Sequence, residues 1–201
     1  MKTIIHTQRV EVIESYNERR DCADQRIGEF IHSCGFLPMA VPNNPTIVKD
    51  ILKFAKPRGI VLVGGNSLVK YGGNAPERDS TDEFLIDFAI KSKIPLYGFC
   101  RGMQSILDYF GNVLVKVSGH AGIRHEVKGD EGCFEVNSYH NEACLELVND
   151  ELVSVMRTED GVIEKVKHRT LPIVGTMWHP ERENPFRDID VAMVQELMSE
   201  R

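Results

Sequence analysis

The sequence predicts an α/β fold in which helices cover both faces of a mostly parallel central sheet. Through the first half of the chain, short apolar runs alternate with amphipathic stretches, an order typical of parallel strands joined by helices. From residue 113 to residue 168 the pattern changes to short β-like pieces between glycine or acidic turns, which indicates a small antiparallel excursion. The 201 residues, 42% of them hydrophobic and 27% charged, fit a single domain spanning 1–201.

Four apolar runs in the first hundred residues are the predicted parallel strands: TII, FLPMAV, GIVLVGG and PLYGFC. Between two of these runs, the amphipathic stretch TIVKDILKFAK stops at Pro57. The stretch STDEFLIDFAIKS, residues 80–92, places its apolar residues at helical spacing. It opens with Ser80 and has Glu83 three residues later, a capping-box pattern. Both stretches are therefore predicted helices.

The second half of the chain begins with a predicted helix. Apolar residues at helical spacing follow Cys100, and Gly111 marks the end of this helix. Short β-like pieces come next, with the sequences VLVKV, IRHEV, CFEVNSY, LVSVMRT and VIEKVKH. LPIVGTMWHPE then has the pattern of a buried strand, and residues 188–200 are a closing helix. The apolar stripe of that helix consists of Ile189, Ala192, Met193 and Leu197.

Charge and cysteine content argue against several classes of function. The formal charge is 24 minus 30, or -6, so the chain lacks the basic excess that general binding to nucleic acid or to an acidic membrane needs. The five cysteines are odd in number and include no C-x-x-C pair, which argues against a disulfide framework or a cysteine-rich zinc site. The first residues become charged too early for a secretory segment, and no apolar stretch is long enough to cross a bilayer. We therefore expect a cytoplasmic protein.

Cys100 stands at a predicted strand-to-helix turn. The run Gly98-Phe99-Cys100-Arg101-Gly102 suits a nucleophile elbow, in which the residues two before and two after the nucleophile approach each other closely. The start of the next helix favours thiolate over thiol, and the Arg101 N–H would face an oxyanion on an attacked carbonyl. A small buried thiol in a tight turn is the alternative interpretation. The other cysteines lack this setting and are interpreted as core or surface residues.

A base for this thiol is predicted near the end of the chain, in the sequence WHPE. His179 and Glu181 are two residues apart at the close of a strand, and in extended chain this spacing points both side chains to the same side. Glu181 could then hold the imidazole of His179 in one orientation, as a thiolate nucleophile requires of its base. A second oxyanion donor is offered by LVGGN, where Gly64 and Gly65 end another strand.

In order along the chain, strand-Gly-Gly, GFCRGMQ and WHPERE resemble the class I glutamine amidotransferase superfamily, and the similarity covers nearly the full chain. The segments YNERRDCADQR, PERDSTDEFLIDFAI and EVNSYHNEA are most similar to its stand-alone γ-glutamyl hydrolases. The resemblance implies a flavodoxin-like sandwich and an enzyme that hydrolyses a γ-glutamyl amide of a small molecule without a metal or an organic cofactor. It implies Cys100 as the nucleophile, His179 as the acid and base, and Glu181 as the group that orients His179.

The resemblance also implies roles for residues around the nucleophile. The N–H groups of Gly65 and Arg101 would form the oxyanion hole. The residues that would hold the α-amino and α-carboxylate groups of the glutamyl substrate are Gln104, Ser138, Tyr139 and His140. Where relatives often have N-S-x-H-H-Q, this chain has Asn141 and Glu142 in the last two positions, which puts the specificity for the leaving group in doubt.

No single motif specifies the leaving group. The sequence is also similar to bacterial enzymes that hydrolyse γ-glutamyl-CDP-amidate during assembly of capsule phosphoramidate, and arginine suits the phosphates of such a leaving group. The candidate contacts are Arg9, Arg19, Arg20, His120, Arg124 and Arg182. For any one of the arginines, a solvated surface charge paired with a neighbouring acid is the favoured interpretation. The rival substrates are γ-glutamyl-polyamine intermediates such as γ-glutamyl-γ-aminobutyrate.

Other functions are weighed against this one. A glutaminase subunit would deliver ammonia to a separate synthase partner, which the resemblance does not favour. A redox sensor could use the same cysteine, but it has no need of the oriented base in HPE. A zinc enzyme built from His120, His125 and His140 is disfavoured because their spacing matches no recognised ligand pattern. The sequence leaves open whether residues 70–80 form a mobile cover over the site.

Overall fold

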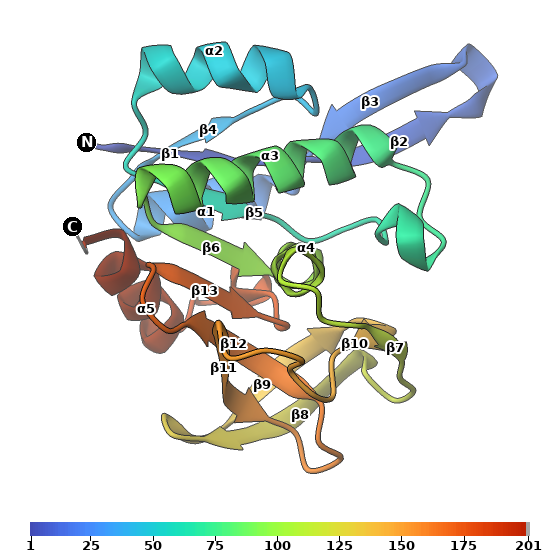
Figure 1. The fold of residues 1–201 in the computed structure, drawn as a ribbon, viewed down its shortest axis with the longest axis vertical. Coiled ribbons are helices and arrows are strands. Elements are labelled where there is room, and N and C mark those ends of the chain that lie inside the picture. The colour runs from blue at the N-terminus through green and yellow to red at the C-terminus, as the bar shows by residue number, and fades with distance from the viewer. Residues whose placement is uncertain (200–201) are drawn as a thin grey trace.

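The computed structural model describes residues 1–199 and contains a sheet with a parallel core (Figure 1). The core strands run in the order β4, β1, β5, β6, β13, and each pairs with its neighbours in parallel. Their bounds are Leu37–Ala40, Thr3–His6, Gly59–Leu62, Leu96–Phe99 and Ile173–Thr176. In chain order this is 2-1-3-4-5, the flavodoxin-like arrangement. The predicted fold class is therefore confirmed.

The antiparallel strands extend the same sheet beyond β13, as the lower part of Figure 1 shows. They follow in the order β12, β11, β8, β9, with bounds Ile163–His168, Leu152–Arg157, Ala121–Gly129 and Gly132–Tyr139. Each pairs antiparallel with the strand before it. Two short strands, β7 (Val115–Lys116) and β10 (Glu142–Ala143), pair with each other. The central sheet is thus mixed, with the predicted excursion forming one end of it.

Helices cover both faces of the parallel core. On one face lie α2 (Pro45–Ala55), α3 (Pro76–Ser92) and α4 (Arg101–Tyr109), and on the other lie α1 (Gln25–Ser33) and α5 (Asp188–Ser199). The strand β5 serves both layers, because side chains of a strand point alternately to its two faces. Ile60 and Leu62 pack with the first set of helices, while Val61 packs with the second. This two-sided burial explains why the core strands read as continuous apolar runs.

The start of α3 differs from the prediction. The capping box at Ser80 and Glu83 is wrong, because the helix begins at Pro76 and Ser80 lies within it, donating from its hydroxyl to the Pro76 carbonyl. Proline at the first helical position supplies the required φ and lacks only an N–H that would have no partner in the helix. Residues 76–80 of the suggested cover are therefore the first turn of α3, and Val69–Tyr71 forms the short helix η2.

The buried side of α5 also differs from the predicted stripe. Ile189 is 45% exposed and Ala192 is exposed, whereas Leu197 is buried as predicted, together with Val194 and Met198. The rotation of the helix follows from Asp190, which is buried and accepts a hydrogen bond of 2.9 Å from the Trp178 indole. Because the buried Trp178 N–H needs a hydrogen-bond acceptor, the helix presents Asp190 to it, and part of the predicted apolar stripe then faces solvent. Glu200, which the prediction included, lies outside the described residues.

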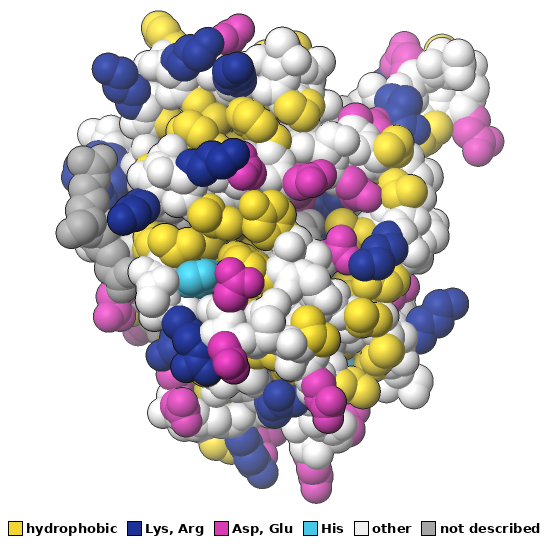
Figure 2. Space-filling view, viewed as in Figure 1, with side chains coloured by type: hydrophobic (Ala, Val, Ile, Leu, Met, Phe, Trp, Pro, Cys, Tyr) yellow, Lys and Arg dark blue, Asp and Glu magenta, His cyan; other side chains and the backbone are white. Residues whose placement is uncertain are grey.

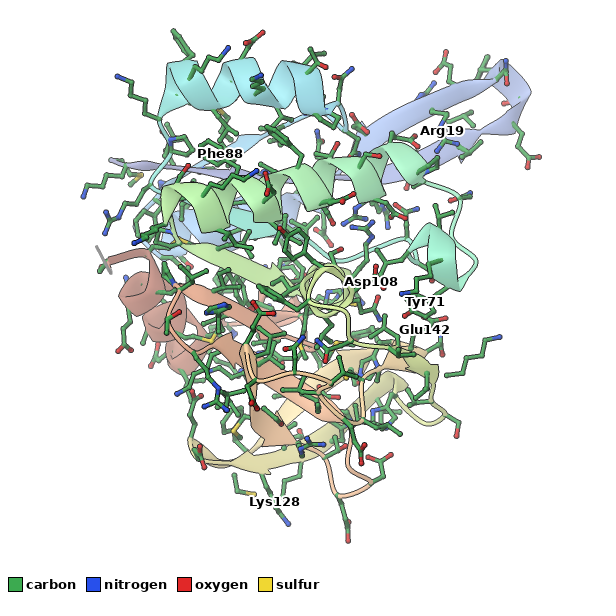
Figure 3. The ribbon with its side chains drawn as sticks, viewed as in Figure 1. Arg19, Tyr71, Phe88, Asp108, Lys128 and Glu142 are labelled. Carbon is green, nitrogen blue, oxygen red and sulfur yellow. The ribbon has the colours of Figure 1, made fainter. Side chains whose placement is uncertain are left out.

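A hairpin that the sequence analysis did not predict leaves the sheet after β1. It consists of β2 (Arg9–Ile13) and β3 (Glu18–Cys22), joined by the short helix η1 (Glu14–Tyr16), and it projects at the upper right of Figure 1. Its strands are mostly exposed and charged, so they lack the apolar alternation of a core strand. Figure 3 shows Arg19 where the hairpin approaches α3, and its guanidinium donates to Glu77 over 2.6 Å.

Basic and acidic side chains are interspersed on the face seen in Figure 2. Among residues 1–199, none of the helices combines the length and the apolar character that crossing a membrane requires.

Two glycines allow β6 and α4 to meet at a sharp turn. A Cβ added at Gly98 would lie 2.7 Å from the Gly102 carbonyl oxygen, and one at Gly102 would lie 2.0 Å from the Leu62 carbonyl oxygen. Between them Cys100 adopts φ 51° and ψ -113°, outside the regions that side chains ordinarily allow. The expected elbow is therefore formed, and backbone contacts hold it.

We expect Gly102→Ala to lower the free energy of unfolding by about 1–3 kcal/mol, because the added methyl must displace the backbone of β5. Urea denaturation measures the change. Gly28→Ala is the matched control, since Gly28 is also helical and an added Cβ would meet Pro38 only at 3.8 Å. That variant should be unchanged or slightly more stable. Equal effects of the two substitutions would contradict the proposed close contact.

Candidate active site

A cavity of about 290 Å³ lies where the core strands end. Ligands in open α/β sheets bind at this carboxyl edge. Several predicted site residues line it: Gly65 after β5, Cys100 and Arg101 after β6, Gln104 in α4, Tyr139 at the end of β9, His140, His179 and Arg182. Segments far apart in the sequence thus meet at one place, as the sequence analysis expected for the nucleophile and its base.

Cys100 and His179 both lie at the wall of this cavity, and each shifts the pKa of the other. Burial by itself raises the pKa of the Cys100 thiol, but the charge of His179, the hydrogen bond with it and the backbone N–H of Arg101 outweigh burial, so the pKa is lowered. For His179 burial disfavours the charged form, yet the thiolate and the Glu181 carboxylate raise its pKa. Both shifts favour a thiolate beside an imidazolium over the neutral pair.

Glu181 orients the imidazole, though through a different backbone from the one expected. Its Oε1 lies 2.7 Å from Nδ1 of His179, and both side chains are buried. The extended spacing assumed in the sequence analysis is wrong, because Pro180–Arg182 forms the short helix η3.

Asn137 fixes the backbone of His179 on both sides, accepting from its N–H and donating to its carbonyl, each over 2.9 Å. A Cβ at Gly64 would lie 2.7 Å from Cε1 of His179, so glycine gives the ring its space.

Arg78 supports the glycine loop from behind, which the sequence analysis did not predict. Its buried guanidinium donates to the carbonyl groups of Val63, Gly64 and Gly65. The peptide bond between Gly64 and Gly65 is trans, so the Gly65 N–H points away from the guanidinium while the Gly64 carbonyl points toward it. Arg78 thereby fixes the direction of the Gly65 N–H, the predicted oxyanion donor. The only sequence signal was an arginine at the start of a helix.

The side chain of Arg101 lies in a buried ionic network. It is 1% exposed and pairs with Asp79 and Asp82, while the Ser105 hydroxyl donates to Asp82 over 2.9 Å. Removing one member of such a network leaves a buried charge without compensation, so the network holds the first turn of α4 against α3. With its guanidinium engaged in this network, Arg101 has only its backbone N–H left for the oxyanion role that the sequence analysis predicted.

The residues predicted to bind the glutamyl group divide into two kinds. Gln104, Tyr139 and His140 line the cavity, and the amide of Gln104 donates to the Glu142 carbonyl over 2.8 Å. The guanidinium of Arg182 lies 4.0 Å from the centre of the Tyr139 ring. Ser138 is fully buried, and its hydroxyl donates to the His120 carbonyl. It therefore lies in the structure behind the cavity wall.

Only two of the six residues predicted to contact a leaving group lie at the Cys100 cavity or the cavity beside it. Arg182 lines the cavity, and Arg9 lines an adjoining one of about 220 Å³ that shares Gly65 and Arg182 with it. The others are engaged elsewhere in the part of the chain described, and none of them lines either cavity: Arg19 with Glu77, Arg20 with Glu18, Arg124 with Glu135 and Glu183, and His120 with Asp160.

Comparison with known proteins agrees with this fold. Residues 21–190 match the family model described as glutamine amidotransferase class-I. The chain is 34% identical to the gamma-glutamyl-CDP-amidate hydrolase of Campylobacter jejuni over 92% of each chain. It is 29% identical to the gamma-glutamyl-gamma-aminobutyrate hydrolase of Escherichia coli O157:H7, over 90% of this chain and 88% of that one. The solved structure of a glutamine amidotransferase from Thermotoga maritima shares the fold, with a TM-score of 0.70, 13% identity and 99% of each chain covered. The chain therefore belongs to the class I glutamine amidotransferase family and is a cysteine-dependent amidohydrolase.

Proposed function

We propose that this protein hydrolyses γ-glutamyl amides through a thioester on Cys100, and that its substrate is γ-glutamyl-CDP-amidate. The observation that carries the proposal is that Cys100 and His179 line one cavity where the core strands end, with the Glu181 carboxylate 2.7 Å from the His179 ring. A nucleophile, an acid and base, and an orienting carboxylate in this order are what acyl transfer from an amide requires.

In the first half of the reaction, the Cys100 thiolate attacks the γ-carbonyl carbon of the substrate. The carbonyl oxygen becomes an oxyanion, which accepts hydrogen bonds from the N–H groups of Gly65 and Arg101. The imidazolium of His179 gives its proton to the departing nitrogen as the C–N bond breaks. The amine or phosphoramidate leaves, and the glutamyl group remains on sulfur as a thioester.

In the second half, neutral His179 takes a proton from a water molecule while the water oxygen attacks the thioester carbon. The tetrahedral intermediate collapses with loss of the Cys100 sulfur, and glutamate is released. The thiolate and the imidazolium of His179 are thereby restored. Glu181 stabilises that imidazolium at both ends of the cycle and prevents the ring from turning.

The cavity wall supplies groups for the glutamyl end of the substrate. We propose Gln104 of α4 and Tyr139 of β9 as the binding side chains there, with Ser138 supporting β9. Nε2 of His140 lies 3.0 Å from the Glu164 carboxylate, so we assign the His140 ring no contact with the glutamyl group. Binding the α-amino and α-carboxylate groups of the glutamyl group holds its γ-carbonyl within reach of the sulfur, and such positioning lowers the activation barrier.

Two arginines and the similarity to the Campylobacter jejuni enzyme support a nucleotide leaving group. Arg182 and Arg9 line adjoining cavities, and guanidinium groups bind phosphate with paired donors. Arg182 is held over the Tyr139 ring, which leaves less conformational freedom to lose on binding. A role in the assembly of capsule phosphoramidate in the cytoplasm follows from this substrate.

Glutamate release from γ-glutamyl-CDP-amidate, γ-glutamyl-γ-aminobutyrate and glutamine tests the proposal. We expect kcat/KM to be highest for the nucleotide, and Cys100→Ala to reduce it by a factor on the order of 10⁴ or more. Cys133→Ala is the control, since Cys133 is an exposed thiol on β9. Slow cleavage of glutamine alone would instead indicate a glutaminase subunit that needs a synthase partner. Full activity of Cys100→Ala would refute the mechanism.

The state of the thiol predicts its dependence on pH. A lowered pKa means that Cys100 is a thiolate below the pH at which an ordinary thiol ionises, so alkylation by iodoacetamide should already be fast at pH 6–7. In His179→Gln the positive charge is lost while burial remains, so the pKa should rise and the rate at pH 7 should fall at least about tenfold. Mass spectrometry of the Cys100 peptide measures the rate. If the alkylation rate of Cys100 depended on pH in the same way with and without His179→Gln, that result would contradict the ion pair.

Arg182→Ala tests the nucleotide leaving group. Loss of a paired phosphate contact should raise KM for γ-glutamyl-CDP-amidate about 10- to 100-fold, because such contacts contribute about 1.5–3 kcal/mol. KM for γ-glutamyl-γ-aminobutyrate should change by less than about threefold. Arg20→Ala serves as the control because Arg20 pairs with Glu18 on the exposed hairpin. An equal rise for both substrates would show that Arg182 does not read the leaving group.

A further inference from the structure

A buried carboxylate in the antiparallel part of the sheet is surrounded by imidazoles. Glu164 on β12 is fully buried. Its Oε1 lies 3.0 Å from Nε2 of His140, 3.5 Å from Nε2 of His125 and 3.8 Å from Nδ1 of His120. His120 directly precedes β8, His125 lies in β8 and His140 directly follows β9, so the sheet brings together groups that are up to 44 residues apart in the chain. The proposed reaction at Cys100 makes no use of Glu164.

Several polar atoms of this cluster are not satisfied by the protein. Oε2 of Glu164, Nδ1 of His120, Nε2 of His125 and Nδ1 of His140 have no hydrogen-bond partner among the described residues. Buried polar atoms are nearly always paired, because leaving one without a partner costs free energy. Two of these nitrogen atoms, Nδ1 of His120 and Nε2 of His125, lie 3.8 and 3.5 Å from Oε1 of Glu164, which indicates a ligand that accepts their lone pairs.

We propose that this cluster binds one divalent transition metal ion, with Zn²⁺ the best match. The ligands are His120, His140 and Glu164, whose ligand atoms lie within 4.8 Å of one another, and His125 is placed to supply a fourth. Two imidazoles and a carboxylate are an established set for zinc.

The distances suit a tetrahedral ion. Zinc bonds of about 2.0–2.1 Å place neighbouring ligand atoms about 3.3 Å apart in a tetrahedron. The three nitrogen-to-oxygen distances of 3.0, 3.5 and 3.8 Å lie on both sides of that value. An ion could therefore enter with small shifts of side chains. Mg²⁺ would fit poorly, because it prefers oxygen ligands and octahedral geometry.

A second carboxylate supports the first ligand. Oδ2 of Asp160 lies 2.9 Å from Nε2 of His120, on the opposite side of the ring from Nδ1. A proton on Nε2 shared with Asp160 leaves Nδ1 with a free lone pair toward Glu164, as is usual for histidines that bind metal. Together the two carboxylates carry the charge that neutralises a divalent cation.

An entry path exists beside the cluster. His120, His125 and Asp160 line a cavity of about 420 Å³ whose other walls come from β8 and from residues 158–160. It is separate from the Cys100 cavity, although His140 lines the latter. The metal would thus reach its ligands without passing the nucleophile.

A proton is the competing occupant. Contact with Glu164 and Asp160 raises the pKa of His120 to about 9, so a protonated His120 could balance the charge of Glu164. A proton satisfies one nitrogen, however, and leaves the other atoms without partners. The spacing of His120, His125 and His140 in the sequence matches no recognised zinc pattern, but the fold places Glu164 of β12 beside them.

Metal binding by the full chain tests the proposal directly. Protein stripped with EDTA is titrated with Zn²⁺ by calorimetry and with Co²⁺ by visible absorption, which reports tetrahedral ligands. Cys100→Ala is the background for all measurements, because the Cys100 and His179 pair could itself bind zinc. We expect one Zn²⁺ per chain, an intense Co²⁺ spectrum and no uptake of Mg²⁺.

Variants locate the ion. His120→Gln and His140→Gln should each weaken Zn²⁺ binding at least about 100-fold, while His32→Gln, an exposed histidine outside the cluster, should not change it. Circular dichroism confirms that the variants are folded. Equal zinc affinity of His120→Gln, His140→Gln and His32→Gln would overturn the proposal. Failure to bind zinc in the Cys100→Ala background would also overturn it, without bearing on the proposed hydrolysis.

Discussion

The close contact of three backbone segments is the constraint on which the active site depends. Gly98 and Gly102 let the start of α4 press against the end of β6 and the Leu62 carbonyl of β5. This contact leaves Cys100 in an unusual backbone conformation with its sulfur at the cavity. The chain must hold that conformation against its cost, which is of order 1–3 kcal/mol for a residue in such a region. The hydrogen bonds of the sheet and the buried helix α4 provide the necessary rigidity.

Charge is distributed in layers around this elbow. The Cys100 sulfur and the His179 imidazole lie at the cavity, and the Glu181 carboxylate contacts the imidazole at Nδ1. On the other side, the buried guanidinium groups of Arg78 and Arg101 hold the glycine loop and the helix start. Each buried charge therefore has a partner or an oriented set of carbonyl groups, so the polar site can exist inside an apolar fold.

Much of the site could be predicted because its signals are local. The glycines around Cys100 reflect contacts within a few residues, and the alternation of strands and helices follows from apolar periodicity. The hairpin β2–β3 was missed because its stability comes from backbone pairing and surface ion pairs, which leave no apolar pattern. Arg78 and Glu164 were missed because their burial depends on segments distant in sequence. The orientation of α5 was wrong in part because a hydrogen bond from Trp178 outweighed the apolar stripe.

The sheet joins two halves that contribute different parts of the site. The nucleophile and the glycine loop follow parallel strands, whereas Tyr139 and His140 come from the antiparallel end, and Asn137 on β9 ties that end to His179. Changes in the loops of the antiparallel half can therefore remodel the substrate pocket while the elbow and its glycines stay intact. Such a division gives evolution a route to new amide substrates at little risk to the chemistry, since Cys100 and the two glycines that flank it lie in the other half.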